Sequence, residues 1–211
     1  MTNHTQGTSS PPLSAILALL TCFCGFMYCL NFSSFFERLH WYSFATDVNL
    51  SMDDFDTFLV FTSIVLFVYY SMFLVLSCML FLRIQRRLNI IFFIMAVIKI
   101  IIIAMMFVPG NNMVFQFGFE ALMEALALLC IIYIRRNSQG GEGMIINRLT
   151  IGIIGILAEC IPLIRNMQFL FFDDMNPFVR ISIIALPCLT AAFIFVYSFN
   201  SYKKPLIPEA A

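Results

Sequence analysis

The sequence predicts an all-α protein, a bundle of helices that crosses a membrane six times. The chain of 211 residues is 61% hydrophobic and only 11% charged, and its mean hydropathy is +0.93. Soluble domains are typically about a quarter charged, so this chain has too few polar residues to cover a globule in water. We therefore expect its apolar exterior to face a lipid bilayer.

Six apolar segments are long enough, or nearly so, to cross the hydrocarbon core, which requires about 20 helical residues. Within a single transmembrane domain over residues 1–211, the predicted spans cover residues 13–36, 57–82, 88–108, 113–134, 149–166 and 178–199. The fifth span is short and contains Gly152, Gly155 and Pro162. If it did not cross, five spans would remain and the C-terminus would move outside.

The basic residues predict the orientation of these spans. With six alternating spans, eight of the 12 Lys and Arg residues fall on one side: Arg83, Arg86, Arg87, Arg135, Arg136, Arg148, Lys203 and Lys204. The opposite side is mostly acidic. Because Lys and Arg in short loops mark the cytoplasmic face, the N- and C-termini are both predicted to be cytosolic.

One glycosylation acceptor is compatible with this orientation. Asn-x-Ser/Thr sequons begin at Asn3, Asn31 and Asn49. Asn3 is predicted to be cytosolic and Asn31 lies in the first span, whereas Asn49 lies in the outer segment 36–56. Asn49 is therefore the candidate site of glycosylation, which would place this multi-pass protein in a eukaryotic endomembrane or the plasma membrane.

Three predicted spans carry an ionisable residue at about the same depth. Lys99 and Glu124 each lie about 11 residues into their spans, or about 16 Å along the axis, near the middle of a core about 30 Å thick. Glu159, about ten residues into the fifth span, reaches the midplane as well. Each such group costs roughly 2.5–3.5 kcal/mol near the bilayer centre, so we expect all three to turn inward and pair.

This charge cluster has several readings. Lys99 and Glu124 could form a structural ion pair that locks two spans together, the cluster could bind or relay an ion, or it could dock another membrane subunit. Lys99 compensates only one carboxylate. If Glu120, Glu124 and Glu159 all ionise, two charges remain, so we expect a protonated Glu or a bound cation.

A polar stripe extends the cluster along one helix. Gln116, Glu120 and Glu124 recur at every fourth residue, on one face of the fourth span. The stripe predicts either a water-accessible half-cavity, open to the exterior and floored by the charged residues, or a polar seam buried against another helix. In the last span, Pro187 is a candidate hinge, and it frees the carbonyl of Ile183 for other contacts.

No cofactor or metal is expected. All seven Cys residues lie in apolar runs, where we expect buried free thiols, and the histidines are His4 and His40 alone. No Cys-His spacing typical of a zinc or haem site is present. The formal net charge of zero gives no indication of a nucleic-acid partner.

The layout of six spans, short loops and cytosolic ends resembles the autophagy-modulator (DRAM-type) family. The similarity lies in residues 107–133 and 178–204, which resemble spans 3–4 and 6 of that family. The Ser-Asp-Thr-Gly and Pro-Pro-Glu signature of the family's first outer loop is represented only by Thr46-Asp47. Its Glu-Trp in the last span is replaced by Leu186-Pro187-Cys188. The resemblance implies a six-span fold and assigns no functional residue.

The sequence supports three functions, in a definite order. The first is a non-enzymatic assembly or lipid-associated component, with other membrane subunits or a second copy as partners. The second is a small proton- or cation-coupled channel or transporter that uses Lys99, Glu120, Glu124 and Glu159. An intramembrane enzyme ranks last, because no nucleophile motif or metal-ligand set accompanies the carboxyl groups.

Overall fold

A computed structural model describes residues 12–31, 52–84, 87–106, 114–136, 143–167 and 176–200 of the chain. These ranges contain six α-helices: α1 (Leu13–Leu30), α3 (Met52–Phe81), α4 (Leu88–Met106), α5 (Val114–Arg136), α6 (Gly143–Met167) and α7 (Pro177–Asn200). The described residues contain helices and no strands, which confirms the predicted all-α class.

Three of the helices are long and apolar enough to cross a membrane. They are Leu13–Leu30 in α1, Val60–Phe81 in α3 and Pro177–Phe199 in α7. The apolar stretch of α4, Leu88–Ala104, is shorter. These lengths and compositions agree with the prediction of a membrane protein.

The helix ends differ from the predicted spans most clearly in α1 and α6. The first span was predicted to reach residue 36, but α1 ends at Leu30 and Asn31 forms a turn. The side-chain amide of Asn31 donates a hydrogen bond to the carbonyl of Met27 over 2.9 Å and thereby caps the helix end. Residues 32–36 lie outside the described ranges. α6 begins at Gly143, six residues before the predicted start, and continues past Pro162.

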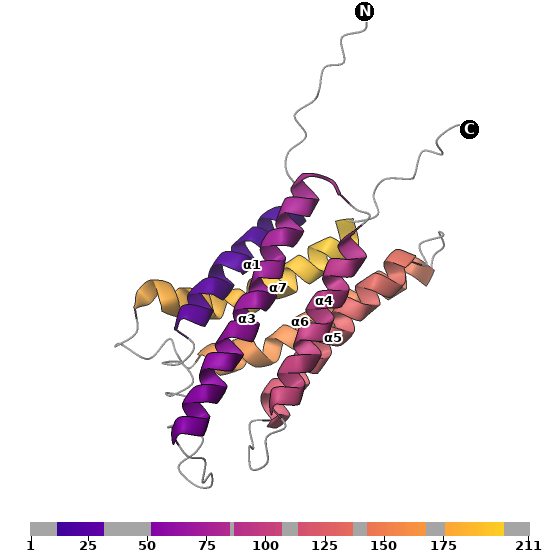
Figure 1. Cartoon of the computed structure of the whole chain (residues 1–211). Helices are drawn as coiled ribbons and strands as arrows, with labels where there is room; N and C mark the ends of the chain where they lie inside the picture. Colours follow the sequence, from indigo (N-terminus) through magenta and orange to yellow (C-terminus); the bar gives the residue numbers. More distant parts are fainter. Residues whose placement is uncertain are drawn as a thin grey trace, which may run out of the picture.

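The six helices form a closed ring. Each helix packs against the next one along the chain, and α7 packs against α1. Successive helices run in opposite directions, and α4 and α5 lie side by side as an antiparallel pair (Figure 1). Among the ring contacts, that between α3 and α4 is the least extensive. A ring of this kind gives every helix an inner and an outer face.

The outer faces are apolar. On α4, for example, Phe93, Val97 and Ile100 are exposed, while Phe92 and Lys99 on the opposite face are buried. This pattern reverses that of a water-soluble bundle, in which the exposed stripe is polar. The exterior of the ring is therefore suited to contact with lipid tails.

Two cysteines contradict the expectation of buried thiols. All seven Cys residues are free, and Cys22 and Cys24 are buried, but Cys78 and Cys188 are exposed. A thiol is only weakly polar and behaves as a small hydrophobic group, so an apolar exterior accommodates it. The apolar runs of the sequence gave no indication of which face each cysteine would occupy.

Aromatic rings fill the interior of one half of the bundle. Phe73, Phe92, Phe193 and Tyr197, which we call the aromatic plug, contact one another at centroid distances of 5.4 Å for Phe73–Phe193, 5.7 Å for Phe193–Tyr197 and 5.0 Å for Phe92–Tyr197. The plug lies in the half that contains the end of α3, the beginning of α4 and the end of α7. The charged residues lie on the other side of it, towards the middle of the ring.

Candidate functional site

The ring brings together three of the predicted charged residues. Lys99 from α4, Glu124 from α5 and Glu159 from α6 are buried, with 4%, 4% and 5% of their surface exposed. The ammonium of Lys99 forms an ion pair with Oε2 of Glu124. The proximity expected from the equal depths of these residues is therefore present in the structure.

Tyr69 on α3 completes the environment of this ion pair. Its hydroxyl donates a hydrogen bond to Oε2 of Glu124 over 3.1 Å, and the Nζ of Lys99 lies 4.3 Å from the centre of its ring. The first contact satisfies the carboxylate, and the second is a cation–π interaction. Sequence reasoning missed Tyr69. The available signal was a tyrosine in the middle of an apolar span, where a buried hydroxyl requires a partner.

Glu159 lies next to this pair but is bonded differently. Its carboxyl group is close enough to that of Glu124 for the two to interact through a hydrogen bond. Its Oε1 atom is buried and has no hydrogen-bond partner within the described part of the chain. Two carboxylates cannot donate to each other, so a hydrogen bond between Glu124 and Glu159 requires a proton on one of them.

The structure describes two of the three residues in the polar stripe predicted on the fourth span. Glu120 and Glu124 lie one turn apart on α5 and both face the same cavity. Glu120 is half-buried. The backbone of Gln116 belongs to α5, but its side chain lies outside the described part of the structure, as does Asn49.

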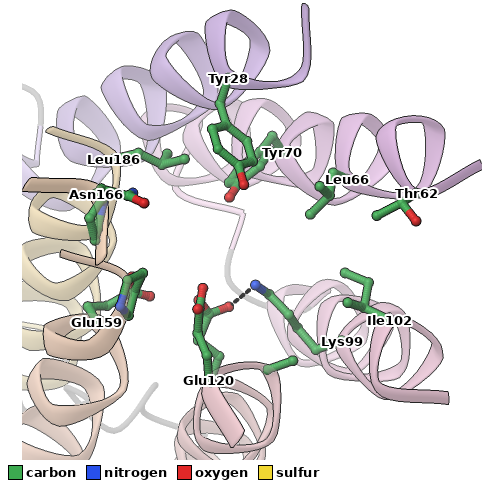
Figure 2. Close-up of a pocket in the computed structure, with 14 residues that line it drawn as sticks. Tyr28, Thr62, Leu66, Tyr70, Lys99, Ile102, Glu120, Glu159, Asn166 and Leu186 are labelled. Carbon is green, nitrogen blue, oxygen red and sulfur yellow. Dashed lines mark ion pairs between the residues drawn. The ribbon is translucent and has the colours of Figure 1, made fainter. Parts of the chain in front are cut away.

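A small cavity adjoins the charged residues, and all six helices contribute to its wall. Its volume is about 50 Å³. Figure 2 shows the side chains of Lys99, Glu120 and Glu159 turned towards this space from α4, α5 and α6. The lining residues are Tyr28, Thr62, Leu66, Tyr70, Lys99, Ile102, Glu120, Ala121, Glu124, Glu159, Pro162, Asn166, Leu186 and Pro187.

The cavity lies in the half of the bundle opposite the aromatic plug. It is bordered by Tyr28 near the end of α1, Thr62 in the first half of α3, Glu120 near the beginning of α5 and Asn166 near the end of α6. The half-cavity reading placed a polar space on this side of Lys99 and Glu124. The opening of such a space to the exterior stays a prediction, as does the alternative of a polar seam buried against another helix.

Pro187 lies inside α7 and forms part of the cavity wall. Proline removes the N–H that would bond the carbonyl four residues earlier, which is that of Ile183. The side-chain amide of Asn166 on α6 donates a hydrogen bond of 3.0 Å to this carbonyl. The carbonyl is thus stabilised by the neighbouring helix, and the hinge role of Pro187 stays a prediction.

A second polar contact lies at the plug end of the bundle. Arg135 on α5 donates hydrogen bonds to Oδ1 of Asn89 over 2.6 Å and to the hydroxyl of Tyr197 over 2.5 Å. These bonds connect α4, α5 and α7 below the aromatic plug. Sequence analysis used Arg135 only as a marker of orientation and did not predict this role.

The size and chemistry of the cavity restrict its ligand. Pockets for organic ligands typically measure about 300–1,000 Å³, whereas about 10–15 Å³ is enough for one water molecule. Within the described ranges, no group of three or more His, Cys, Asp or Glu side chains is placed to hold a metal ion. The arrangement is suited to water, a proton or a small monovalent cation.

Comparison with known proteins gives no family assignment. The chain matches no protein-family model, no curated protein and no solved structure. The resemblance to the autophagy-modulator family stays a prediction.

Proposed function

We propose that the chain is a six-span, multi-pass membrane protein with both ends in the cytosol, in a eukaryotic endomembrane or the plasma membrane. The alternating directions of the six helices support this topology (Figure 1). α4, α5 and α6 each contain an ionisable residue, but the ring buries these residues on inner faces. Burial of this kind is how membrane helices tolerate charged groups.

Within this topology, we propose that the protein is a small proton- or cation-coupled channel or transporter. The observation that carries this proposal is the convergence of Lys99, Glu124 and Glu159 on one cavity to which all six helices contribute. Intramembrane ionisable groups that face a water-sized space are typical of ion and proton pathways. Glu120, nearer the beginning of α5, adds a carboxyl group along the same route.

The position of the charges argues against their use in docking a partner. They lie inside a closed ring of helices, so a helix of another subunit would have to enter the ring to reach them. Partner subunits, or a second copy of the chain, would instead meet the apolar outer faces. The assembly role that ranked first from the sequence thus loses the support of the charge cluster.

A structural role for Lys99 and Glu124 remains the second candidate. Their ion pair joins α4 to α5, and the bond from Tyr69 adds α3. This reading explains the pair but gives no role to Oε1 of Glu159, which is buried and has no hydrogen-bond partner within the described residues. In this case the protein would be a non-enzymatic assembly or lipid-associated component.

The half of the bundle that the aromatic plug fills is compatible with gated transport. The cavity extends from Lys99 towards one end, and the aromatic plug fills the path towards the other end. Passage through the ring would require Phe73 and Phe193 to separate. We expect Arg135, which is bonded to Tyr197 of the plug, to couple that movement to the end that we propose to be cytosolic.

Reconstitution into liposomes tests this proposal. The purified protein is incorporated into vesicles that contain a pH-sensitive dye, and a proton or cation gradient is applied. We expect a flux in the wild type that is lost in Glu159→Gln and Glu124→Gln. Asp174→Asn, the same chemical change in the segment between α6 and α7, serves as the control and should keep the flux. The absence of flux in the wild type, together with a stably co-purifying membrane subunit, would favour the assembly role.

A further inference from the structure

Glu124 and Glu159 are adjacent carboxyl groups with unequal surroundings. Oε2 of Glu124 is paired with the ammonium of Lys99 and accepts a hydrogen bond from Tyr69. Oε1 of Glu159 has no partner within the described part of the chain, although 95% of the residue's surface is covered. The negative charge of Glu124 is therefore compensated, and that of Glu159 is not.

The cost of burial decides where a proton resides. An isolated carboxylate is so unfavourable in an apolar interior that the group takes up a proton instead. Among the three fully buried residues, one ammonium beside two carboxyl groups leaves one negative charge in excess, and one proton removes it; Glu120 is only half-buried and is not part of this count. Lys99 and Tyr69 both contact Oε2 of Glu124, whereas Oε1 of Glu159 has no partner within the described residues, so we assign the proton to Glu159.

We propose that Glu159 is a proton-binding site that exchanges with water in the cavity, and that Glu124 is its fixed counter-charge. This inference rests on the proposed function, because it identifies the coupled ion as a proton. In the loading step, a hydronium ion in the cavity gives its proton to the carboxylate of Glu159 and becomes water. In the release step, the O–H bond of the acid breaks and a cavity water takes up the proton.

The cavity supplies a route for this exchange. The hydroxyl of Thr62 on α3 is buried and has no hydrogen-bond partner within the described residues. Thr62 and Glu159 lie on opposite sides of the cavity (Figure 2). A volume of about 50 Å³ accommodates a few waters, since about 10–15 Å³ is enough for each. Waters in this space would satisfy both unpartnered side chains and connect them.

The electrostatic environment of Glu159 is set by side chains from the helices around the cavity. Lys99 from α4 brings one ammonium group to the cavity that Glu159 lines, and Glu120 and Glu124 from α5 bring two carboxyl groups. From α1 and α3, the phenols of Tyr28 and Tyr70 line the same cavity, and Tyr69 contacts Glu124. α7 contributes Leu186 and Pro187 to the cavity wall, neither of which titrates. The acidic neighbours thus outnumber the single cation.

Infrared spectroscopy of the purified protein in lipid tests the proposal directly, because a buried carboxylic acid has a C=O stretching band separate from that of a carboxylate. We expect the wild type to show such a band at neutral pH, and its frequency to shift in D₂O. Glu159→Gln should abolish it, and the matched control Glu120→Gln should retain it. A band that is absent from the wild type, or that survives in Glu159→Gln, would overturn the proposal.

A second variant preserves every carboxyl group and tests the route. In Thr62→Val the acid band should persist, but its shift after transfer into D₂O should be several-fold slower than in the wild type. An unchanged rate would show that the cavity is not the path to Glu159. Circular dichroism and size-exclusion chromatography verify that each variant folds. A wild type with the acid band but without proton flux in liposomes would contradict the transport function alone, whereas flux without the band would contradict this inference alone.

Discussion

The side-chain amide of Asn166 on α6 binds the carbonyl oxygen of Ile183 on α7, at a distance of 3.0 Å. This is the carbonyl that Pro187 deprives of its helical donor. Both Asn166 and Pro187 line the cavity, so the bond fixes the relation of α6 to α7 at the cavity wall. A break in one helix is thus repaired by its neighbour.

The first prediction concerns this repair. Asn166→Leu removes the donor and leaves the buried carbonyl of Ile183 unsatisfied, which should lower the free energy of unfolding by about 1–3 kcal/mol. Pro187→Ala restores the backbone N–H, so Asn166→Leu should cost much less in that background. Denaturation in detergent micelles of the wild type, the two single variants and the double variant measures these costs. Equal costs in the two backgrounds would show that the bond does not compensate for the proline.

The second prediction concerns the ion pair. Lys99→Met leaves the carboxylate of Glu124 buried without its cation, and breaking a buried pair in this way typically costs about 3–5 kcal/mol. Lys99→Met combined with Glu124→Gln removes both charges and should recover part of the loss. The midpoint of thermal denaturation in micelles provides the comparison. A double variant no more stable than Lys99→Met would contradict the pairing.

The third prediction concerns close helix packing at glycines. A Cβ at Gly155 would overlap the branched Cβ region of Ile194 on α7, and a Cβ at Gly25 would overlap the base of the Tyr70 side chain. Neither neighbour can move without shifting its helix, so Gly155→Ala and Gly25→Ala should each destabilise the bundle by about 1–3 kcal/mol. At Gly152 the added Cβ meets the ring edge of Phe195. This ring is the outer end of a side chain and can rotate, so Gly152→Ala is the control and should have the smallest effect in unfolding measurements.

The fourth prediction concerns orientation. If the termini are cytosolic, Asn49 is on the outer side and should carry a single N-linked glycan when the protein is expressed in eukaryotic cells. Treatment with an endoglycosidase should increase the electrophoretic mobility of the wild type and leave Asn49→Gln unchanged. A glycan on Asn3 would reverse the orientation, because that residue would then have passed into the lumen.

Helix identity and the burial of charges could be read from the sequence because both follow from the cost of polar groups in an apolar medium. Six apolar runs predicted six helices, and their alternation placed Lys99, Glu124 and Glu159 at one depth. Depth needs only a count of residues at about 1.5 Å each. The ion pair and the proximity of Glu159 follow from that count and from the penalty for a charge that faces lipid.

The partners of those charges could not be read in the same way. The contact from Tyr69 depends on the rotation of α3 about its own axis, and that helix is apolar around most of its circumference, so its sequence shows no preferred inner face. The predicted end of the first span was wrong for a related reason. Residues 32–36 continue the apolar run, and hydropathy does not register a cap such as the bond from the Asn31 amide to Met27.

The contact of α7 with α1 has a consequence for how the protein is made. α1 leaves the ribosome before the other five described helices, but the ring closes only when α7 has been inserted beside it. The Lys99–Glu124 pair can form much earlier, because α4 and α5 are consecutive and can enter the bilayer as a hairpin. Closure of the ring therefore depends on α7, the last of the six described helices in chain order, and a premature stop codon before Pro177 would yield an open bundle that membrane quality control should recognise and degrade.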